Sequence, residues 1–287
     1  MLASFVITLR EGLEAALIIG IIAAYLAKIG RRDLNKYLYL GAGGAIGASA
    51  ILAIVFNAVY GGLEGKSEEI FEGIAALTAT VVLTYMIFWM AKHSREIKGE
   101  LQKGVDVAIS TGELVKIASL SFIVVLREGV ETVLFLTAAA VTEPGGTLLG
   151  FALGLVVSVS LAVMLFKGVY RLDLGKFFKY TSILLVIFAA GITVNGIHAL
   201  QEGRVIPILV WEDQWTAGHE LTADQAYEGI LEPSGLTGTL LAMLFGYHGT
   251  GTPSFFMLVG YVGYWVLVGS YVLRTYRTAE SPSPAPS

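Results

Sequence analysis

The chain has 287 residues, of which 55% are hydrophobic and 15% charged, with a mean hydropathy of +0.71 and a formal net charge of −4. A soluble domain carries about a quarter charged residues, so this composition indicates an integral membrane protein. Cysteine is absent, which excludes disulfides, thiolate metal sites and cysteine nucleophiles, and the basic residues form no patch that would bind nucleic acid.

Seven segments are long and apolar enough to cross a bilayer, since a span needs about 20 mostly apolar residues. In chain order they cover roughly residues 3–27, 37–60, 70–92, 116–140, 146–168, 179–201 and 255–274. The predicted fold is therefore an all-α integral membrane protein with seven transmembrane helices.

The loops between these spans alternate in their content of basic residues. Counted together with the adjoining span ends, the loops after the first, third and fifth spans each carry four Lys or Arg residues, and Arg274 and Arg277 lie at and after the end of the seventh span. The other loops contain only Lys66 and Arg204. Because basic loops stay on the cytoplasmic side, we expect a multi-pass protein of the plasma (inner) membrane with its N-terminus outside and its C-terminus in the cytoplasm.

Three stretches outside the spans have patterns of their own. The inner stretch 93–113 places apolar residues at every fourth position from Ile97 to Ile109, which predicts an amphipathic helix at the membrane surface. The outer stretch 203–254 holds six acidic residues and two tryptophans and is predicted to form short surface helices. The tail 276–287 is rich in Ser and Pro and is predicted to be disordered.

Two of the spans contain charged side chains, which are energetically unfavourable inside a bilayer. The first carries Arg10-Glu11-Gly12-Leu13-Glu14, and the fourth carries Arg127-Glu128-Gly129-Val130-Glu131. One charged side chain near the middle of a transmembrane helix costs roughly 2.5–3.5 kcal/mol on insertion scales, and such residues usually face a protein interior or an ion pathway. We therefore expect these two motifs to be the centre of the function.

The motifs belong to an internal repeat. Residues 4–14 align without gaps on residues 121–131, at an offset of 117 positions. This match relates the first span to the fourth, so that two units of three spans lie in opposite orientations and the seventh span is an addition. Inverted repeats of this kind are typical of secondary transporters, with the substrate site at the repeat interface near the midplane.

The expected organisation follows from this repeat. It comprises a first three-helix repeat at 1–92, a cytoplasmic amphipathic linker at 93–115, a second, inverted three-helix repeat at 116–202, an extracytoplasmic loop at 203–254, a seventh helix at 255–275 and the tail at 276–287.

Each motif places its three charges on one face of a helix. At about 100° per residue, Arg10, Glu11 and Glu14 face the same way, and Gly12 lies at the back, where another helix can pack closely. We expect Arg10 to pair with Glu14 four positions on, and the second motif to repeat this arrangement. Each motif then keeps a net charge of −1, and two facing motifs carry −2.

A surplus of carboxylates in a low dielectric either binds protons or recruits a cation. The acidic residues of the two motifs can supply several oxygen ligands to one hard metal ion, with Arg10 and Arg127 as supporting charges. The candidate metal ligands are Glu11, Glu14, Glu128 and Glu131. The alternative role, buried Arg–Glu pairs that hold helices together, is disfavoured because small polar residues do this at lower cost.

Further polar residues lie at the outer ends of two spans. Glu69 and Glu72 begin the third span, and His198 and Glu202 end the sixth, so they are candidates for outer capture or gating of a cation. The alternatives are that acids at a helix N-terminus complement its dipole, and that a lone His in a helix is a hydrogen-bonded packing residue.

The doubled Arg-Glu-x-x-Glu motif resembles that of the oxidase-dependent iron permeases of the fungal FTR and bacterial EfeU type. The resemblance continues through Glu69-Ile-Phe-Glu72-Gly73, His198-Ala-Leu-Gln-Glu202 and Leu244-Phe-Gly-Tyr247, and so covers nearly the whole chain. It implies a high-affinity iron permease, and not an enzyme, that moves iron into the cytoplasm through the four motif carboxylates. Iron is then a transported substrate, and no cofactor is permanently bound.

The resemblance also implies a separate partner, either a multicopper oxidase or periplasmic iron-handling proteins, besides the lipid bilayer itself. Two alternatives stay open at this point. One is transport of another hard or borderline divalent cation, such as manganese or lead. The other is a membrane carboxylate di-iron enzyme, which is disfavoured because such sites add Glu-x-x-His pairs and no Glu here is followed by His three residues later.

Overall fold

The structure of the chain, a computed structural model, describes residues 1–93, 96–113, 115–142, 144–167, 174–208 and 254–271. Within these ranges the chain is helical and contains no strand. Most of the predicted outer stretch, the match at Leu244–Tyr247 and the predicted tail lie outside the described residues.

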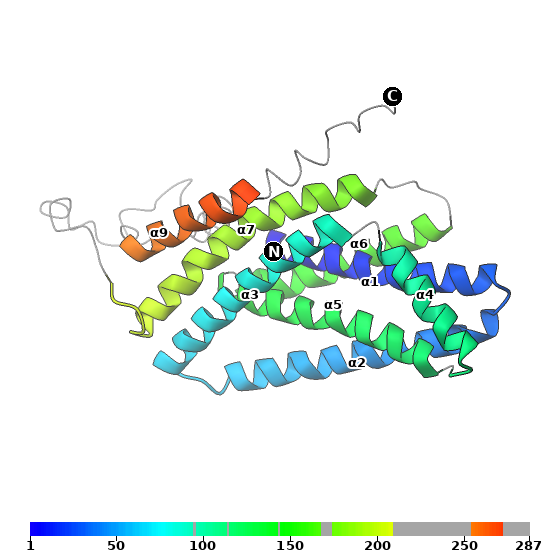
Figure 1. Ribbon diagram of the computed structural model, residues 1–287. Helices are drawn as coiled ribbons and strands as arrows, with labels where there is room; N and C mark the ends of the chain where they lie inside the picture. Colours follow the sequence, from blue (N-terminus) through cyan, green and yellow to red (C-terminus); the bar gives the residue numbers. More distant parts are fainter. Residues whose placement is uncertain (94–95, 114, 143, 168–173, 209–253, 272–287) are drawn as a thin grey trace, which may run out of the picture. The chain divides into compact units, whose positions relative to one another are not determined.

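Each predicted span overlaps a helix among the described residues, although the helix at the seventh span is described only as far as Gly269 (Figure 1). The α-helices of the described residues are α1 (Leu2–Lys28), α2 (Asn35–Tyr60), α3 (Lys66–His93), α4 (Ile97–Ser110), α5 (Val115–Thr142), α6 (Pro144–Phe166), α7 (Leu174–Glu202) and α9 (Phe255–Tyr264). A short 3₁₀ turn, η1 (Arg32–Leu34), precedes α2, and a π-helical turn, η2 (Trp265–Gly269), follows α9.

Four helical segments are long and apolar enough to cross a membrane within the described part of the chain. They are Arg32–Tyr60, Lys66–Met90, Gly145–Phe166 and Gly175–Glu202. Apolar side chains on their outer faces are exposed, for example Leu40 at 70% and Leu148 at 76%. Contiguous apolar surface of this kind is stable in lipid and not in water, so the chain is a multi-pass membrane protein.

The helices group by packing into two compact units, each described here by itself. The first unit comprises residues 1–68 and 92–185, and the second comprises residues 69–91 and 186–287, as far as the latter are described. The first unit therefore contains α1, α2, α4, α5 and α6.

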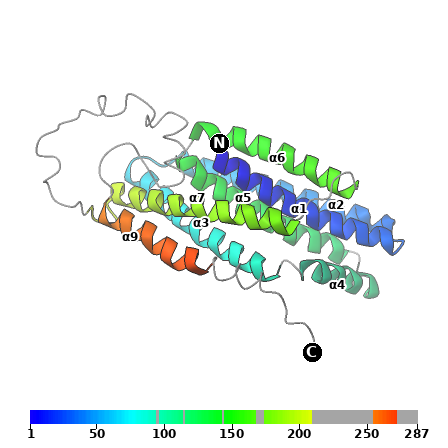
Figure 2. The same cartoon turned by 90° about the horizontal axis from the view of Figure 1, so that it is seen from above.

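In the first unit, α1 packs mainly against α6, and α2 packs mainly against α5 (Figure 2). Both pairs run parallel, because successive turns of one helix meet successive turns of the other. Gly154 meets the backbone at Phe5 and Ser158 meets Gly12, while Gly41 meets Ala118 and Ser49 meets Gly129. Helix α1 also packs directly against α5, and this contact brings the two charged motifs together.

Helix α4 closes one end of this unit. Its apolar face, at Leu101, Val105 and Ala108, is buried against Ile22 of α1 and Ile117 of α5 in one apolar cluster. The predicted amphipathic helix is thus present, but α1 and α5 cover this part of its apolar face, which is therefore not available to lipid. The hydroxyl of Tyr25 on α1 donates a hydrogen bond to Asp106 of α4 over 2.6 Å.

Glycines in the left-handed conformation end two of these helices. Gly30 has φ +76° directly after α1, and the amide of Arg31 donates back to the carbonyl of Leu26 over 2.8 Å. Gly112 has φ +70° after α4. Because only glycine adopts this conformation without strain, the chain turns at these positions instead of continuing the helix.

In the second unit, α3 and α7 run antiparallel. Gly73 near the start of α3 meets Leu200 near the end of α7, and further along the hydroxyl of Thr193 donates to that of Thr80 over 3.4 Å. Helix α9 packs against this pair, because Gly260 leaves no room for a Cβ beside Ile197 of α7 and the hydroxyl of Tyr264 lies 3.3 Å from that of Thr84 on α3.

Candidate metal site

The two charged motifs meet in the middle of the first unit, on neighbouring turns of α1 and α5. Arg10 and Glu11 are 0% and 1% exposed, and Glu14 is 3% exposed, so all three face the interior as the helical spacing predicts. On α5, Glu128 is 2% exposed, while the side chains of Glu131 and Arg127 are 13% and 38% exposed.

The glycine of each motif lies at the back of its helix, as predicted, and another helix packs there. Gly12 faces Ser158 of α6, and a Cβ at this position would lie 2.5 Å from the Ser158 Oγ. Gly129 faces Ser49 of α2 in the same way, with no room for a Cβ. The absence of a side chain at these glycines therefore lets α6 and α2 pack closely behind the two motifs.

Arg127 binds carboxylates of both motifs. Its Nη2 lies 2.6 Å from Oε1 of Glu128 and 3.4 Å from Oε1 of Glu14, and its Nε lies 3.6 Å from Oε1 of Glu131. The expected pair between Arg127 and Glu131, four residues apart, is therefore confirmed. The pair with Glu14 joins α5 to α1.

Arg10 behaves differently from its counterpart. The expected pair with Glu14 is wrong, because Glu14 turns to Arg127, and none of the three guanidinium nitrogens of Arg10 has a hydrogen-bond partner among the described residues. Arg10 still lies close enough to Glu11, Glu14 and Glu131 to interact with them electrostatically. A buried donor left without a hydrogen-bond partner costs about 1–3 kcal/mol.

Three of the four candidate ligands lie close enough to share one ion. One ligand oxygen from each of Glu11, Glu128 and Glu131 lies within 4.8 Å of the others, and Glu14 does not belong to this group. The group draws on both motifs, with Glu11 from α1 and the other two from α5.

The carboxylates keep free ligand atoms. Both oxygens of Glu11 and the Oε2 atoms of Glu14, Glu128 and Glu131 are buried without a hydrogen-bond partner in the described part of the chain. A buried acceptor left unpaired costs about 1–3 kcal/mol. With four carboxylates and two guanidinium groups, the cluster carries −2 when every group is ionised, and a hard cation with oxygen ligands would relieve both the charge and the missing bonds.

The polar residues predicted at the outer end lie together at one end of the α3–α7 pair. Glu69 and Glu72 occupy the first turns of α3, and His198 and Glu202 the last turns of α7. The Nε2 of His198 lies 3.4 Å from Oε1 of Glu202. All four are partly exposed or exposed, in contrast to the buried charges of the first unit.

Two polar features of α7 were not predicted from the sequence. Gln201 is buried, donates to the carbonyl of Pro207 over 3.1 Å and accepts from the hydroxyl of Ser254 over 2.9 Å. Asn195 is 2% exposed, and neither atom of its amide has a partner among the described residues. The signal available in the sequence was an asparagine in the apolar run that ends at Ile197.

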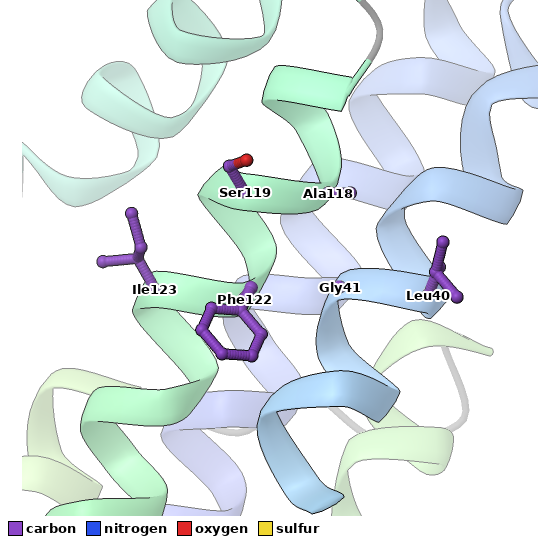
Figure 3. A pocket seen from close by; sticks show the side chains of 6 residues that line it. All are labelled: Leu40, Gly41, Ala118, Ser119, Phe122 and Ile123. Carbon is purple, nitrogen blue, oxygen red and sulfur yellow. The ribbon is translucent and has the colours of Figure 1, made fainter. Parts of the chain in front are cut away.

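A surface cavity between α2 and α5 lies apart from the charged cluster. It has a volume of about 340 Å³ and is lined by Leu40, Gly41, Ala118, Ser119, Phe122 and Ile123 (Figure 3). Leu40 and Ile123 are 70% and 65% exposed. Because the lining is apolar except for one hydroxyl, the cavity offers no ligand set for a cation.

Comparison with known proteins places these features in a family. The iron permease FTR1 family matches residues 1–281. An uncharacterized protein of Archaeoglobus fulgidus is 36% identical over 281 residues, which cover 96% of both chains. The ferrous iron permease EfeU of Escherichia coli O6:H1 is 38% identical over 251 residues, or 86% of this chain and 87% of that one. EfeU of Yersinia pestis is 35% identical over 257 residues, or 88% and 87%. No solved structure matches.

Proposed function

Since the chain belongs to the iron permease FTR1 family, we propose that it moves iron across the plasma membrane into the cytoplasm through the carboxylates of its two Arg-Glu-x-x-Glu motifs. The observation that carries this proposal is the buried group of Glu11, Glu128 and Glu131, whose ligand oxygens lie within 4.8 Å of one another. Their free oxygens and the charge surplus make a site for a hard cation.

Iron is the cargo in this proposal, and no resident cofactor takes part. The relatives from Escherichia coli and Yersinia pestis are named ferrous iron permeases, which favours Fe²⁺ as the species that reaches the site. A periplasmic iron-handling protein acting before the permease would be compatible with Fe²⁺ as cargo, whereas a separate multicopper oxidase acting there would deliver Fe³⁺ instead. Such a partner would present iron at the outer face.

The proposed topology has seven spans with the N-terminus outside. Helices α1 and α5 have 27 and 28 residues, which at about 1.5 Å per residue exceeds the roughly 30 Å hydrocarbon core of a bilayer. With α1, α5 and α9 with its π-helical turn added to the four apolar helices, the number of spans would be seven. The basic loops after the first, third and fifth spans favour this orientation.

An inverted repeat is proposed to relate α1 and α2 to α5 and α6. Its support is that equivalent contacts occur twice. Gly12 of α1 meets Ser158 of α6, and Gly129 of α5 meets Ser49 of α2. A two-fold axis between α1 and α5 would exchange these contacts, and would place the cation at the interface of the repeats.

Glu69, Glu72, His198 and Glu202 are proposed to collect the cation before it enters the central site. Their support is their position together at one end of the α3–α7 pair, where they are accessible to solvent. Carboxylates at a surface raise the local concentration of cations, so their role concerns capture rather than passage.

Exchange of Glu14 or Glu131 for Gln tests the proposal. Either change removes one negative charge from the cluster while keeping the size of the side chain. We expect each variant to reach the membrane and to lose uptake of radioactive iron in cells or in liposomes. Normal uptake by either variant would contradict the assignment of the motifs.

Competition by other cations separates iron from the alternative cargoes. An iron permease should lose only a modest part of its iron flux under excess Mg²⁺, which dehydrates reluctantly and requires nearly ideal octahedral ligands. If Mn²⁺ or Pb²⁺ is instead taken up faster than iron at equal concentration, the cargo is one of these ions.

A further inference from the structure

The two arginines of the motifs contribute to the charged cluster in different ways. Arg127 pairs directly with carboxylates of both motifs, with nitrogen–oxygen distances of 2.6 to 3.6 Å. Arg10 is fully buried, and none of its three guanidinium nitrogens has a hydrogen-bond partner in the described part of the chain. Arg10 therefore acts on the cluster through its positive charge, and not through bonds that hold a carboxylate in place.

The charge of Arg10 acts on three of the four motif carboxylates. Its guanidinium group lies close enough to Glu11, Glu14 and Glu131 to interact with them electrostatically. Glu11 and Glu131 belong to the group that can share one ion, and Glu14 does not. Because charges interact more strongly away from water, the buried guanidinium reduces the attraction that these carboxylates exert on an incoming cation.

Six groups set the net charge of the cluster. Its four carboxylates and two guanidinium groups give −2 when all are ionised. In α1, α2, α5 and α6 the only other charged residues are Lys28, Lys36 and Lys116, and each is one of the first two or last two residues of its helix. One divalent cation therefore brings the cluster to zero net charge, whereas a trivalent cation leaves +1. Without Arg10 the surplus would be −3, which matches a trivalent cation instead.

We propose that Arg10 is a specificity-determining residue that sets the valence of the ion at the central site: its buried charge matches the cluster to a divalent cation and disfavours a trivalent one. A net charge buried in a low dielectric is unfavourable, so the match acts on the affinity itself. The same charge keeps the affinity moderate, because a transport site must also release its ion. This role rests on the proposed iron transport and deepens it, since it selects Fe²⁺ over Fe³⁺.

Three variants separate the charge of Arg10 from its shape. Arg10→Met removes one positive charge and no hydrogen bond that the structure shows. Arg10→Lys keeps the charge but lacks the planar guanidinium group. Lys116→Gln is the matched control for a lost positive charge, because the side chain of Lys116 is 46% exposed and pairs with Glu113 at the start of α5, away from the cluster.

The test measures Kd for both oxidation states of iron on the purified full-length chain in detergent, with Fe²⁺ kept anaerobic and free Fe³⁺ buffered by nitrilotriacetate. We expect R10M to bind both ions more tightly than the native chain. Fe³⁺ should gain about tenfold or more over Fe²⁺, because the lost positive charge repels the ion of higher charge more strongly. The reduction potential of the bound iron should then fall by about 59 mV for each tenfold. R10K and K116Q should keep the ratio of the two Kd values within about threefold of the native ratio.

A purely structural role of Arg10 predicts the opposite result. If Arg10 only held the helices or the carboxylates in place, R10M would weaken the binding of both ions by similar factors. R10K would do the same, since an ammonium group does not reproduce the geometry of a guanidinium group. A ratio of the two Kd values in R10M that stays within about threefold of the native ratio overturns the proposal.

A compensating change tests the charge count directly. Glu14 contributes charge but does not belong to the ion-binding group, and the amide oxygen of a glutamine there can still accept a hydrogen bond from Arg127. E14Q alone should move the ratio about tenfold towards Fe²⁺, and R10M/E14Q should return it to within about threefold of the native ratio. If R10M does not fold, as size-exclusion profiles would show, E14Q alone keeps the test, because an unchanged ratio contradicts the charge match.

Failure of the proposed function gives a different result. If the native chain binds no Fe²⁺ and liposomes that contain it take up no iron, the cargo assignment fails before any variant is compared. If the native chain binds and transports Fe²⁺ but R10M leaves the ratio unchanged, only the role of Arg10 fails. At saturating Fe²⁺ we expect R10M to transport more slowly than the native chain, because a tighter site releases its ion more slowly.

Discussion

The charged cluster of α1 and α5 and the polar end of the α3–α7 pair contain the same kinds of side chain but differ in their surroundings. In the cluster, Arg10 and Glu11 are at most 1% exposed and have no hydrogen-bond partner among the described residues. At the polar end, the side chains of His198 and Glu202 are 34% and 51% exposed and pair with each other.

This difference shows which charged residues are energetically costly, and therefore call for a functional reason, and which are not. A solvated pair contributes about 0–1 kcal/mol and can be gained or lost freely. In the cluster, several buried oxygens and nitrogens have no hydrogen-bond partner among the described residues, and each such atom costs about 1–3 kcal/mol, so a ligand that satisfies them accounts for the cluster better than structure alone. We therefore expect variants of the cluster to abolish uptake and variants of the polar end to tune it.

The largest effect is expected at the carboxylates of the ion-binding group, Glu11, Glu128 and Glu131. Glu11→Gln or Glu128→Gln should lower iron uptake about 100-fold or more, since even outer partners of metal ligands commonly cost 10- to 100-fold. Uptake of radioactive iron into liposomes measures this. The control is Glu113→Gln, whose carboxylate is 59% exposed and pairs with Lys116; its uptake should stay within about twofold of the native rate. Retained uptake in E11Q would show that the buried cluster is not needed for transport, and would contradict the contrast drawn with the polar end of α3 and α7.

The next effect concerns the close packing of α2 behind the second motif. Gly129→Ala should destabilise the fold by about 1–3 kcal/mol, because overpacking of a filled contact forces neighbours to shift and the hydroxyl of Ser49 is held by the carbonyl of Ala45 over 2.9 Å. Thermal unfolding in detergent measures the change. Gly47→Ala, on α2 with nothing within 4 Å of its Cβ position, is the control and should be neutral or stabilising. Equal melting temperatures for the two variants would contradict the close contact.

A smaller effect is expected at the polar end of α3 and α7. Glu202→Gln or His198→Ala should raise the KM for iron about threefold to tenfold and leave the maximal rate nearly unchanged, because capture residues affect the concentration of the ion near the site and not its passage. Uptake measured over a range of iron concentrations separates the two constants. A fall in maximal rate at an unchanged KM would place these residues in the permeation step.

The smallest effect is expected where α4 joins α1. Tyr25→Phe removes the hydrogen bond to Asp106 and should reduce stability by about 0.5–1.5 kcal/mol, without affecting the affinity for iron. Thermal unfolding and Fe²⁺ binding on the same sample check both statements. A change in iron affinity would indicate that α4 communicates with the cluster.

The contact between α1 and α5 could be predicted because the repeat relates Arg10 to Arg127. The helical fold and the four apolar helices long enough to cross a membrane followed from hydrophobic runs of about 20 residues or more, and the role of Gly12 followed from its place at the back of the charged face. In each case one local property, either hydrophobic length or helical spacing, decides the structure.

The pairing of the charges could not be predicted in the same way. The two motifs have the same charges at the same spacing, so nothing in the sequence distinguishes Arg10 from Arg127, and the expected pair of Arg10 with Glu14 was wrong. Which arginine binds Glu14 depends on the relative positions of α1 and α5. The repeat predicts the same surroundings for both arginines and so cannot decide between them. The buried amide of Asn195 was missed for a related reason, since its burial depends on packing between helices far apart in the sequence.

Helix α1 packs on α6 and α2 packs on α5, so each helix of the first half needs a partner from the second half. This pairing has a consequence for membrane insertion during synthesis. Arg10, Glu11 and Glu14 leave the ribosome 117 residues before their counterparts on α5, and α6, which covers Gly12, follows later still. At about 5–20 residues per second, the first span spends roughly 6–23 s with its three charges unmatched. During biogenesis that helix must therefore be sheltered by the insertion machinery or wait at the membrane surface until the second half of the chain arrives.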